Sequence, residues 1–474
     1  MITKIIKYYA AVLLVSLLFP VIADARIEYT LFPRLSIEGR YSDNYYNREK
    51  DYNRGSFKDD ALLITVSPGI LLSLITRNTT LDLDYSLNSR GYFLEREEDR
   101  FSYFNQRGNA LFRANLLRDF SVLLRDEIIK DEDITLIDPM LTREVRIAKY
   151  IRNLGGGEFI YQYGDGREVS IGYFLTIVDY FSVDDDNKRD EIRGRVTHRF
   201  NIRNTGEATY RRSFVDYKTI RVGRYNLYED EVRGRFMHYF TPRFSTGLNY
   251  GYIETHYDEP LGSLPIDYHI HDAALESTYD INRSLRVDGR IGLFMREVYV
   301  YGKEDDQWNK GLVYRAGITY TYPTFLGMVA YEGGYGSNYI NPERLEYYNY
   351  WRLSGDTTYH IVRDILMLIG RGSYGVYRYP DSSNSRRDHI WNGGGGINYR
   401  IVDWLLLSLD YNHTARNSNT PGLHYVENTY LARITLSYRY STIEREGVLR
   451  REGEREDREG RETERRRGEE RNAE

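Results

Sequence analysis

The chain of 474 residues contains 46 tyrosines, 18 phenylalanines and 4 tryptophans. Its mean hydropathy of -0.60 is too polar for a bundle of membrane helices, and so many aromatic residues favour β-sheet. A net charge of -5 and an isoelectric point near 6.1 point to no nucleic-acid partner, and the lack of cysteine excludes disulfide bonds and thiolate metal sites.

The first 25 residues have the pattern of a cleaved secretory signal peptide. Lys4 and Lys7 precede an apolar run at residues 10–22, and Ala23-Asp24-Ala25 is an A-x-A cleavage site. An N-terminal membrane anchor is the alternative, but the run is shorter than the ~20 residues that a spanning helix needs. We therefore expect a signal peptide at residues 1–25 and export of the mature chain.

The mature chain opens with two predicted strands. The first covers residues 34–41, where apolar and polar side chains alternate. The second covers residues 61–75, an apolar run with Pro68-Gly69 in its middle. Because proline cannot donate to a sheet ladder, we expect a strand that carries a bulge there.

A repeated sequence then sets the pattern for the rest of the chain. Residues 190–200 read DEIRGRVTHRF, and residues 230–240 read DEVRGRFMHYF. In the first copy Ile192, Val196 and Phe200 alternate with charged residues, and in the second Val232, Phe236 and Phe240 do so. This period of two indicates strands with one apolar and one charged face.

The aromatic residue that closes each copy recurs about every 40 residues, which is a structural repeat. We expect these residues to form an aromatic girdle on the periplasmic side of a barrel: Tyr161, Phe200, Phe240, Tyr279, Tyr320, Tyr359, Tyr399 and Tyr440. Strands that lead away from the short turns are predicted at 168–181, 206–217, 244–257, 285–301, 326–339, 365–379 and 404–417.

The turns and loops predict the architecture. Nine short turns alternate with ten longer polar loops, which gives about twenty antiparallel strands. This predicts an all-β, closed transmembrane β-barrel of 18 to 20 strands at residues 26–441, with periplasmic turns and extracellular loops. A soluble propeller, the alternative, needs four short strands per repeat.

Residues 442–474 hold 12 acidic residues and 10 arginines, a tail that cannot form a core.

No group of side chains in the sequence predicts a catalytic or metal site. His269 and His271 share a strand face but have no third ligand in view. Residues 184–187 (DDDN) lack the spacing of a calcium loop, and Gly393 to Gly396 lack the lysine of a phosphate loop. His198 and His238 are expected on the outward face, and the sequence pairs neither with the serine that a lipase dyad would need.

Arginine dominates the charged face. We expect the lumen to be lined by Arg193, Arg195, Arg199, Arg233, Arg235, Arg286, Arg290, Arg296, Arg315 and Arg433. Rings of arginine favour anions and can bind carboxylates or sugars. Equally, these charges can pair across strands and serve only to stiffen the wall. The residues leave both interpretations open.

Residues 31–47 (LFPRLSIEGRYSDNYYN) and 64–74 (ITVSPGILLSL) resemble the start of the beta-barrel porin 2 family, and the similarity extends to Tyr440. The resemblance implies an outer-membrane barrel linked to exopolysaccharide export, without catalytic residues or cofactors. It also implies about eighteen strands. If that number holds, the count of twenty from the turns and loops includes one hairpin too many, near residues 116–129. Such barrels end on an aromatic residue, whereas here the charged tail follows.

The expected function is a Gram-negative outer-membrane pore for an exported polysaccharide, and not an enzyme. A general or anion-preferring porin for small solutes, and a structural barrel without conductance, are the alternatives. Expected partners are outer-membrane lipid, the barrel-assembly machinery and a periplasmic polysaccharide export protein.

Overall fold

The computed structural model describes residues 27–44, 60–94, 102–131, 149–181, 186–218, 226–258, 266–300, 307–336, 348–380, 385–420 and 423–441. Apart from turns and bends, these residues form β-strands. No helix among them is long and apolar enough to cross a membrane. The predicted signal peptide at 1–25 and the charged tail at 442–474 lie outside the described residues.

The strands in chain order are β1 (Glu28–Ser42), β2 (Ala61–Ile75), β3 (Thr79–Leu94), β4 (Ser102–Leu117), β5 (Phe120–Asp131), β6 (Tyr150–Gly164), β7 (Arg167–Tyr180), β8 (Asn187–Asn201), β9 (Asn204–Tyr217), β10 (Leu227–Thr241), β11 (Phe244–Tyr257), β12 (Ile266–Asp280), β13 (Leu285–Val300), β14 (Gln307–Tyr322), β15 (Phe325–Gly336), β16 (Tyr348–Val362), β17 (Leu366–Arg378), β18 (Arg387–Val402), β19 (Leu405–Ser418), β20 (Tyr425–Ser437) and β21 (Tyr440–Ser441).

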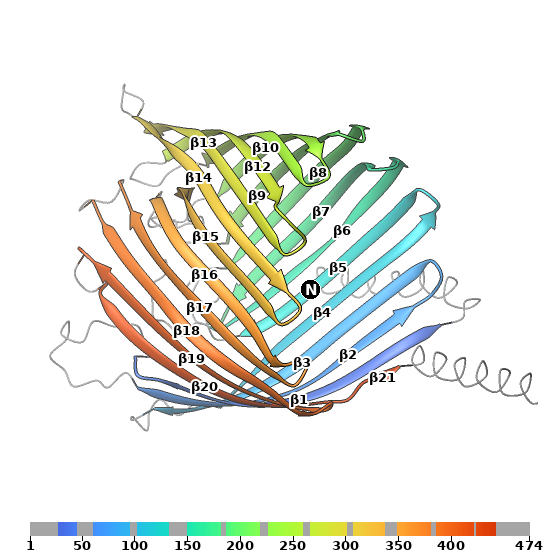
Figure 1. The fold of residues 1–474 in the computed structure, drawn as a ribbon, viewed down its shortest axis with the longest axis vertical. Helices are drawn as coiled ribbons and strands as arrows, with labels where there is room; N and C mark the ends of the chain where they lie inside the picture. Colours follow the sequence, from blue (N-terminus) through green and yellow to red (C-terminus); the bar gives the residue numbers. More distant parts are fainter. Residues whose placement is uncertain are drawn as a thin grey trace, which may run out of the picture.

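The strands form one closed sheet. Each strand from β1 to β19 pairs antiparallel with the next, and β1 pairs with β20 from Arg34↔Ser437 to Ser42↔Thr429. The two residues of β21 prolong this seam by pairing with Thr30 and Leu31. Figure 1 shows the blue β1 beside the red β20, where the two ends of the wall meet. The predicted closed antiparallel β-barrel is confirmed.

Twenty long strands are present in the described part of the chain, so the estimate of about eighteen that the family resemblance implied is wrong. The doubtful hairpin near residues 116–129 is real, because β4 and β5 pair from Gln106↔Lys130 to Leu117↔Phe120. Only Arg118 and Asp119 separate the two strands. The short connections lie at one end of the barrel, the turn end, and the long ones at the other, the loop end.

Two local predictions need correction. The first strand begins at Glu28 rather than Arg34, because β2 continues to pair with it as far as Glu28↔Ile75. The bulge expected at Pro68-Gly69 does not form. Pairing with β3 stops after Val66↔Ser89 and resumes at Gly69↔Ser86 in the same register. The missing N–H of Pro68 therefore interrupts the ladder without adding a residue to it.

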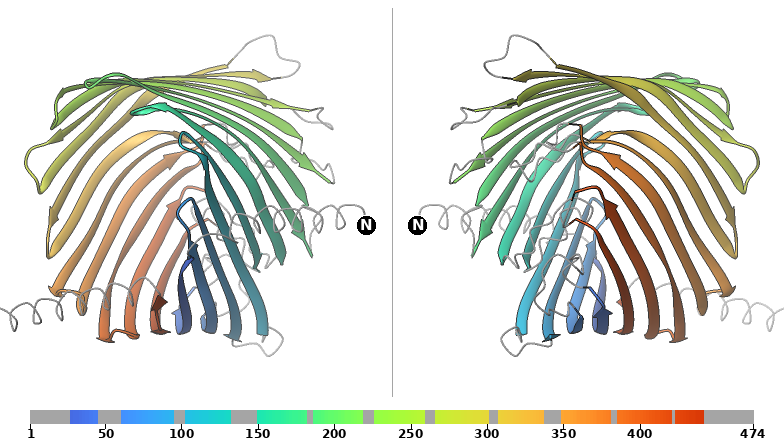
Figure 2. Two further views of the ribbon diagram at one scale, coloured as in Figure 1. Left: turned by 90° about the vertical axis from the view of Figure 1, so that its right-hand side faces the viewer. Right: turned by 90° about the vertical axis from the view of Figure 1, so that its left-hand side faces the viewer.

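The two faces of the wall differ as the alternating sequence predicts. On β8, Ile192, Val196 and Phe200 are 41%, 41% and 57% exposed, which places them on the outer surface. On the opposite face, Arg235 of β10 pairs with Glu276 of β12 across the intervening β11. Side chains on second-neighbour strands converge only on the concave side of a curved wall, so this face is the interior. Figure 2 shows the tilted strands from two sides.

Candidate functional site: the charged inner wall

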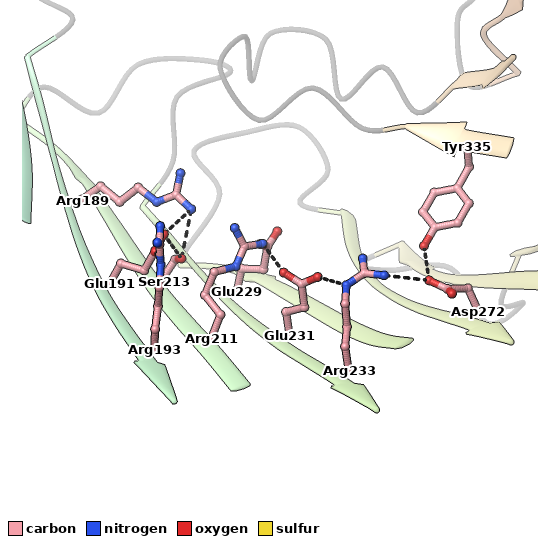
Figure 3. Close-up of polar contacts among 10 residues, drawn as sticks. All are labelled: Arg189, Glu191, Arg193, Arg211, Ser213, Glu229, Glu231, Arg233, Asp272 and Tyr335. Carbon is pink, nitrogen blue, oxygen red and sulfur yellow. Dashed lines mark hydrogen bonds and ion pairs between the residues drawn. The ribbon is translucent and has the colours of Figure 1, made fainter. Parts of the chain in front are cut away.

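Two sets of polar and charged side chains make contacts on the inner face of β8 to β13, and Figure 3 shows all of these residues except Arg290. We call the two sets together the inner charge network. It consists of Arg189, Glu191, Arg193, Arg211, Ser213, Glu229, Glu231, Arg233, Asp272 and Arg290, with Tyr335 of β15 bound to Asp272. The odd-numbered positions of β8, β9 and β10 and the even-numbered positions of β12 and β13 face inward, which brings these residues onto one surface.

The part of the network on β8 and β9 surrounds one carboxylate. Glu191 forms ion pairs with Arg189, at 2.9 Å, and with Arg193. The Ser213 hydroxyl of β9 lies 3.4 Å from the same carboxylate and 3.1 Å from Arg189. Both ion pairs lie along β8, and only the Ser213 hydroxyl reaches across from β9, so the group holds two guanidinium groups beside one carboxylate.

The part on β9 to β13 is longer. Arg211 lies 2.7 Å from Glu229 and 2.5 Å from Glu231, and Glu231 also binds Arg233. Arg233 in turn lies 3.6 Å from Asp272 of β12, whose carboxylate is also 3.1 Å from Arg290 of β13.

Gly251 of β11 makes this bridge from β10 to β12 possible. A Cβ at that position would lie 2.7 Å from the Asp272 Oδ2 atom and 3.3 Å from the Arg233 Nη1 atom. Because glycine has no side chain, the guanidinium and the carboxylate can meet above the intervening strand. The glycine is thus part of the site, although it carries no functional group.

A second group of charges lies on β4, β5 and β6. The carboxylate of Glu127 is within 3.8 Å of Arg107, 2.8 Å of Arg125 and 3.1 Å of Arg152. Three guanidinium groups therefore share one carboxylate. Sequence reasoning missed this group, because only the strand register brings residues 107, 127 and 152 together.

The acidic and basic side chains differ in their exposure to water. Glu127, Glu191, Glu229 and Asp272 are 7%, 7%, 5% and 4% exposed, whereas Arg107, Arg125 and Arg193 are 65%, 48% and 54% exposed. The inner charge network and the group around Glu127 together contain eight arginines and five carboxylates. Guanidinium groups thus cover the carboxylates and present positive charge to the interior.

Most of the predicted lumen arginines lie on this inner face. Arg193, Arg233 and Arg290 belong to the inner charge network. The others on the inner face are each paired with a carboxylate: Arg195 with Glu207, Arg235 with Glu276, Arg315 with Asp288 and Arg433 with Glu38. The cross-strand pairing that the sequence left open is therefore present, and it coexists with exposed guanidinium groups.

Three predicted arginines are placed differently. Arg199 pairs with Asp165 and Arg286 with Asp280, and both pairs lie at the turn end of the barrel. Arg296 is only 2% exposed, and its guanidinium lies 5.1 Å from the centre of the Tyr268 ring. Arg296 therefore does not line an open path, because aromatic packing covers it.

The predicted aromatic girdle lies at the turn end. Tyr161, Phe200, Phe240, Tyr279, Tyr320, Tyr359 and Tyr399 are on the outer surface and 41% to 57% exposed. Tyr440 packs against Tyr29, with ring centroids 5.8 Å apart. His198 and His238 join this outer belt. The His198 Nδ1 atom is 2.9 Å from the Tyr163 hydroxyl, and the His238 ring packs edge-on against Phe240.

The remaining candidates have structural surroundings. His269 lies 3.4 Å from Glu254, and the His271 Nδ1 atom lies 2.8 Å from the Tyr250 hydroxyl. No cluster of three or more acidic or histidine ligands that could hold a metal is found among the described residues. In the glycine run of β18, a Cβ at Gly394 would lie 2.6 Å from the Tyr411 carbonyl oxygen. Residues 182–185, which include part of the DDDN sequence, lie outside the described residues.

A scan against protein-family models finds no match for this chain, and a search of curated proteins finds none either. Among solved structures, the outer membrane protein OpdK from Pseudomonas aeruginosa is 12% identical, with 86% of this chain and 99% of that chain covered and a TM-score of 0.42. OccAB2 from Acinetobacter baumannii is 12% identical, with coverages of 88% and 98% and a TM-score of 0.41. The siderophore receptor PirA from Pseudomonas aeruginosa is 9% identical, with coverages of 86% and 80% and a TM-score of 0.47. Likenesses this weak assign no family.

Proposed function

We propose that the chain is an outer-membrane pore that prefers small anionic solutes. The observation that carries the proposal is the burial of the inner carboxylates beneath exposed arginines. Positive groups that line a water-filled passage attract anions and repel cations. Barrels with about twenty strands enclose an aqueous channel unless something plugs it.

The outer surface supports the membrane location. Soluble proteins rarely expose large continuous apolar patches, yet apolar side chains on the outer face of β8, β10 and their neighbours are exposed. On β10 the outward apolar residues Val232, Phe236 and Phe240 span eight residues. Eight residues in a strand tilted by about 40° cover about 21 Å, close to the ~25 Å height of the apolar band of outer-membrane barrels. At the seam, β20 pairs with β1, so the first and last long strands leave no unpaired edge there for the lipid to meet.

Polysaccharide export, the function that the family resemblance implied, has no family match to support it. The inner wall is rich in paired charges, which suits the attraction of small ions and carboxylated solutes at least as well. Accumulation of polysaccharide in the periplasm after deletion of the gene would favour export instead. Assembly by the barrel-assembly machinery belongs to the same proposal.

The test is the reversal potential of the purified protein in a planar bilayer with a gradient of potassium chloride. We expect a reversal potential of the sign that anion preference gives. Arg193→Ser should move it toward zero, because an exposed positive charge is lost while Glu191 keeps its contact with Arg189 at 2.9 Å.

Arg212→Ser is the matched control. Arg212 lies on the outer face of β9, with its guanidinium 5.0 Å from the centre of the Phe214 ring, and should leave the reversal potential unchanged. A refolded protein that carries no current, or one that prefers cations, would overturn the proposal.

A further inference from the structure

The barrel wall divides between β14 and β15 at the loop end. β14 remains paired with β13 as far as Val298↔Gln307. Its pairing with β15 ends at Tyr314↔Gly333, so residues 307–313 have no partner on β15 within the described part of the chain. β15 itself stays paired with β16 up to Gly336↔Tyr348. The loop end of β15 thus leaves β14, as the separation of the two strands in Figure 1 shows.

The detached end of β15 lies over the inner wall. The Tyr335 hydroxyl donates a hydrogen bond of 2.9 Å to the Oδ2 atom of Asp272, on β12. Three strand spacings separate β12 from β15, about 14 Å along the wall, which is too far for these two side chains to span within one sheet layer. The end of β15 must therefore fold inward, and Figure 3 shows Tyr335 pointing from β15 toward Asp272.

Aromatic and apolar packing holds this end in place. The ring of Tyr335 lies 4.7 Å from that of Phe294 on β13, centroid to centroid. Tyr335 also packs against a buried cluster on the inner face that includes Ile253 and Tyr268. Because aromatic contacts and apolar burial add to the hydrogen bond, the inward position is held by more than one interaction.

The local sequence suits a strand end that leaves the sheet. Tyr335 is flanked by Gly333, Gly334 and Gly336, and glycine in a strand weakens it or marks a bend. On β14, Gly311 leaves room for the packing, because a Cβ there would collide with the ring of Phe294. We call residues 333–336 the β15 strap.

The strap is tied to the inner charge network through Asp272. This carboxylate is 4% exposed and also lies 3.1 Å from Arg290 and 3.6 Å from Arg233. A buried carboxylate needs its partners, so movement of Tyr335 would change how Asp272 holds the two guanidinium groups.

We propose that the β15 strap narrows the pore and that Tyr335 is a positioning residue. Tyr335 sets the width of the passage by holding the strap inward, and it sets the anion preference through its hydrogen bond to Asp272. The proposal rests on the pore function proposed above and adds the place where selection occurs. Arg233 and Arg290 are the side chains that meet the passing ion, and Tyr335 acts through the carboxylate that orients them.

The experiment compares single-channel records of the full mature chain with those of Tyr335→Ala and Tyr335→Phe. Tyr335→Ala removes the ring and the hydrogen bond, and we expect a larger unit conductance and a reversal potential closer to zero. Tyr335→Phe keeps the ring and removes only the hydroxyl, so its change should be smaller and in the same direction. A difference in gel mobility between the unheated and the heated protein confirms that each variant is folded.

Tyr331→Ala is the matched control, because Tyr331 lies on the outer face of the same strand, 42% exposed. It should match the wild type in unit conductance and reversal potential.

If the wild type conducts and Arg193→Ser shifts its reversal potential while folded Tyr335→Ala behaves as wild type, the strap proposal fails and the pore proposal stands. If the wild type carries no current, the pore proposal fails first. A purely structural role for Tyr335 would lower the unfolding midpoint and leave the unit conductance unchanged, which also overturns the proposal.

Discussion

Replacing Phe236 with arginine should prevent stable insertion of the barrel. Phe236 lies on the outer face of β10, 44% exposed, four residues from Phe240 and six from Asp230. With strands tilted by about 40°, these separations are about 10 Å and 15 Å along the membrane normal, which places the side chain near the middle of the apolar band. An arginine on the lipid face at that depth costs about 2 to 4 kcal/mol.

Such a cost would lower the equilibrium constant for folding into a bilayer by roughly 30-fold to 900-fold. The assay is refolding from urea into lipid vesicles, followed by the shift in gel mobility of the unheated protein. Phe236→Leu is the control for loss of the aromatic ring and should refold as the wild type does. The urea midpoint of Phe236→Arg should fall well below that of Phe236→Leu.

Arg233→Ser provides the comparison on the inner face. Glu231 would keep Arg211 at 2.5 Å, and Asp272 would keep Arg290 at 3.1 Å and Tyr335 at 2.9 Å. No buried carboxylate loses all its partners, so this variant should refold and show only a weaker preference for anions. Equal refolding of Phe236→Arg and Phe236→Leu would refute the assignment of the two faces.

Two further substitutions test the inner wall. Gly251→Val puts a Cβ 2.7 Å from the Asp272 Oδ2 atom, so it should break the contact between Arg233 and Asp272. The free energy of unfolding should fall by about 1 to 3 kcal/mol, which would be measured as a lower urea midpoint. The reversal potential should move nearer to zero. An unchanged midpoint would show that the bridge does not need the glycine. Glu127→Gln removes the carboxylate shared by three arginines and should strengthen the anion preference while lowering the urea midpoint. A weaker anion preference would contradict the positive character of the interior.

Much of the fold follows from local sequence. Because strand side chains alternate strictly, the exposed Ile192 and Val196 and the inward Arg193 could be assigned without a structure. Counting the short turns and the long loops gave about twenty strands, and the turn at Arg118 and Asp119 shows that this count was better than the one implied by family resemblance. The register effect of Pro68 could not be predicted, because it depends on whether the partner strands stay aligned.

The site was less predictable, because its contacts join residues that are far apart in the sequence. Glu127 gathers Arg107 and Arg152 from the strands on either side, and no spacing rule links those three positions. The contact between Tyr335 and Asp272 crosses three strands and depends on where the wall divides. Sequence alternation placed Arg296 among the lining residues but could not reveal that the Tyr268 ring covers it.

The most direct test of the account is cysteine labelling along β10. The chain has no native cysteine, so single cysteines at positions 232 to 236 report their surroundings without interference. In vesicles, cysteines at 233 and 235 should react with a charged, water-soluble thiol reagent, whereas those at 232, 234 and 236 should react only with an apolar one. The same reactivity toward the charged reagent at all five positions, or a periodicity of three to four residues, would contradict a barrel with an apolar exterior and an arginine-rich aqueous interior.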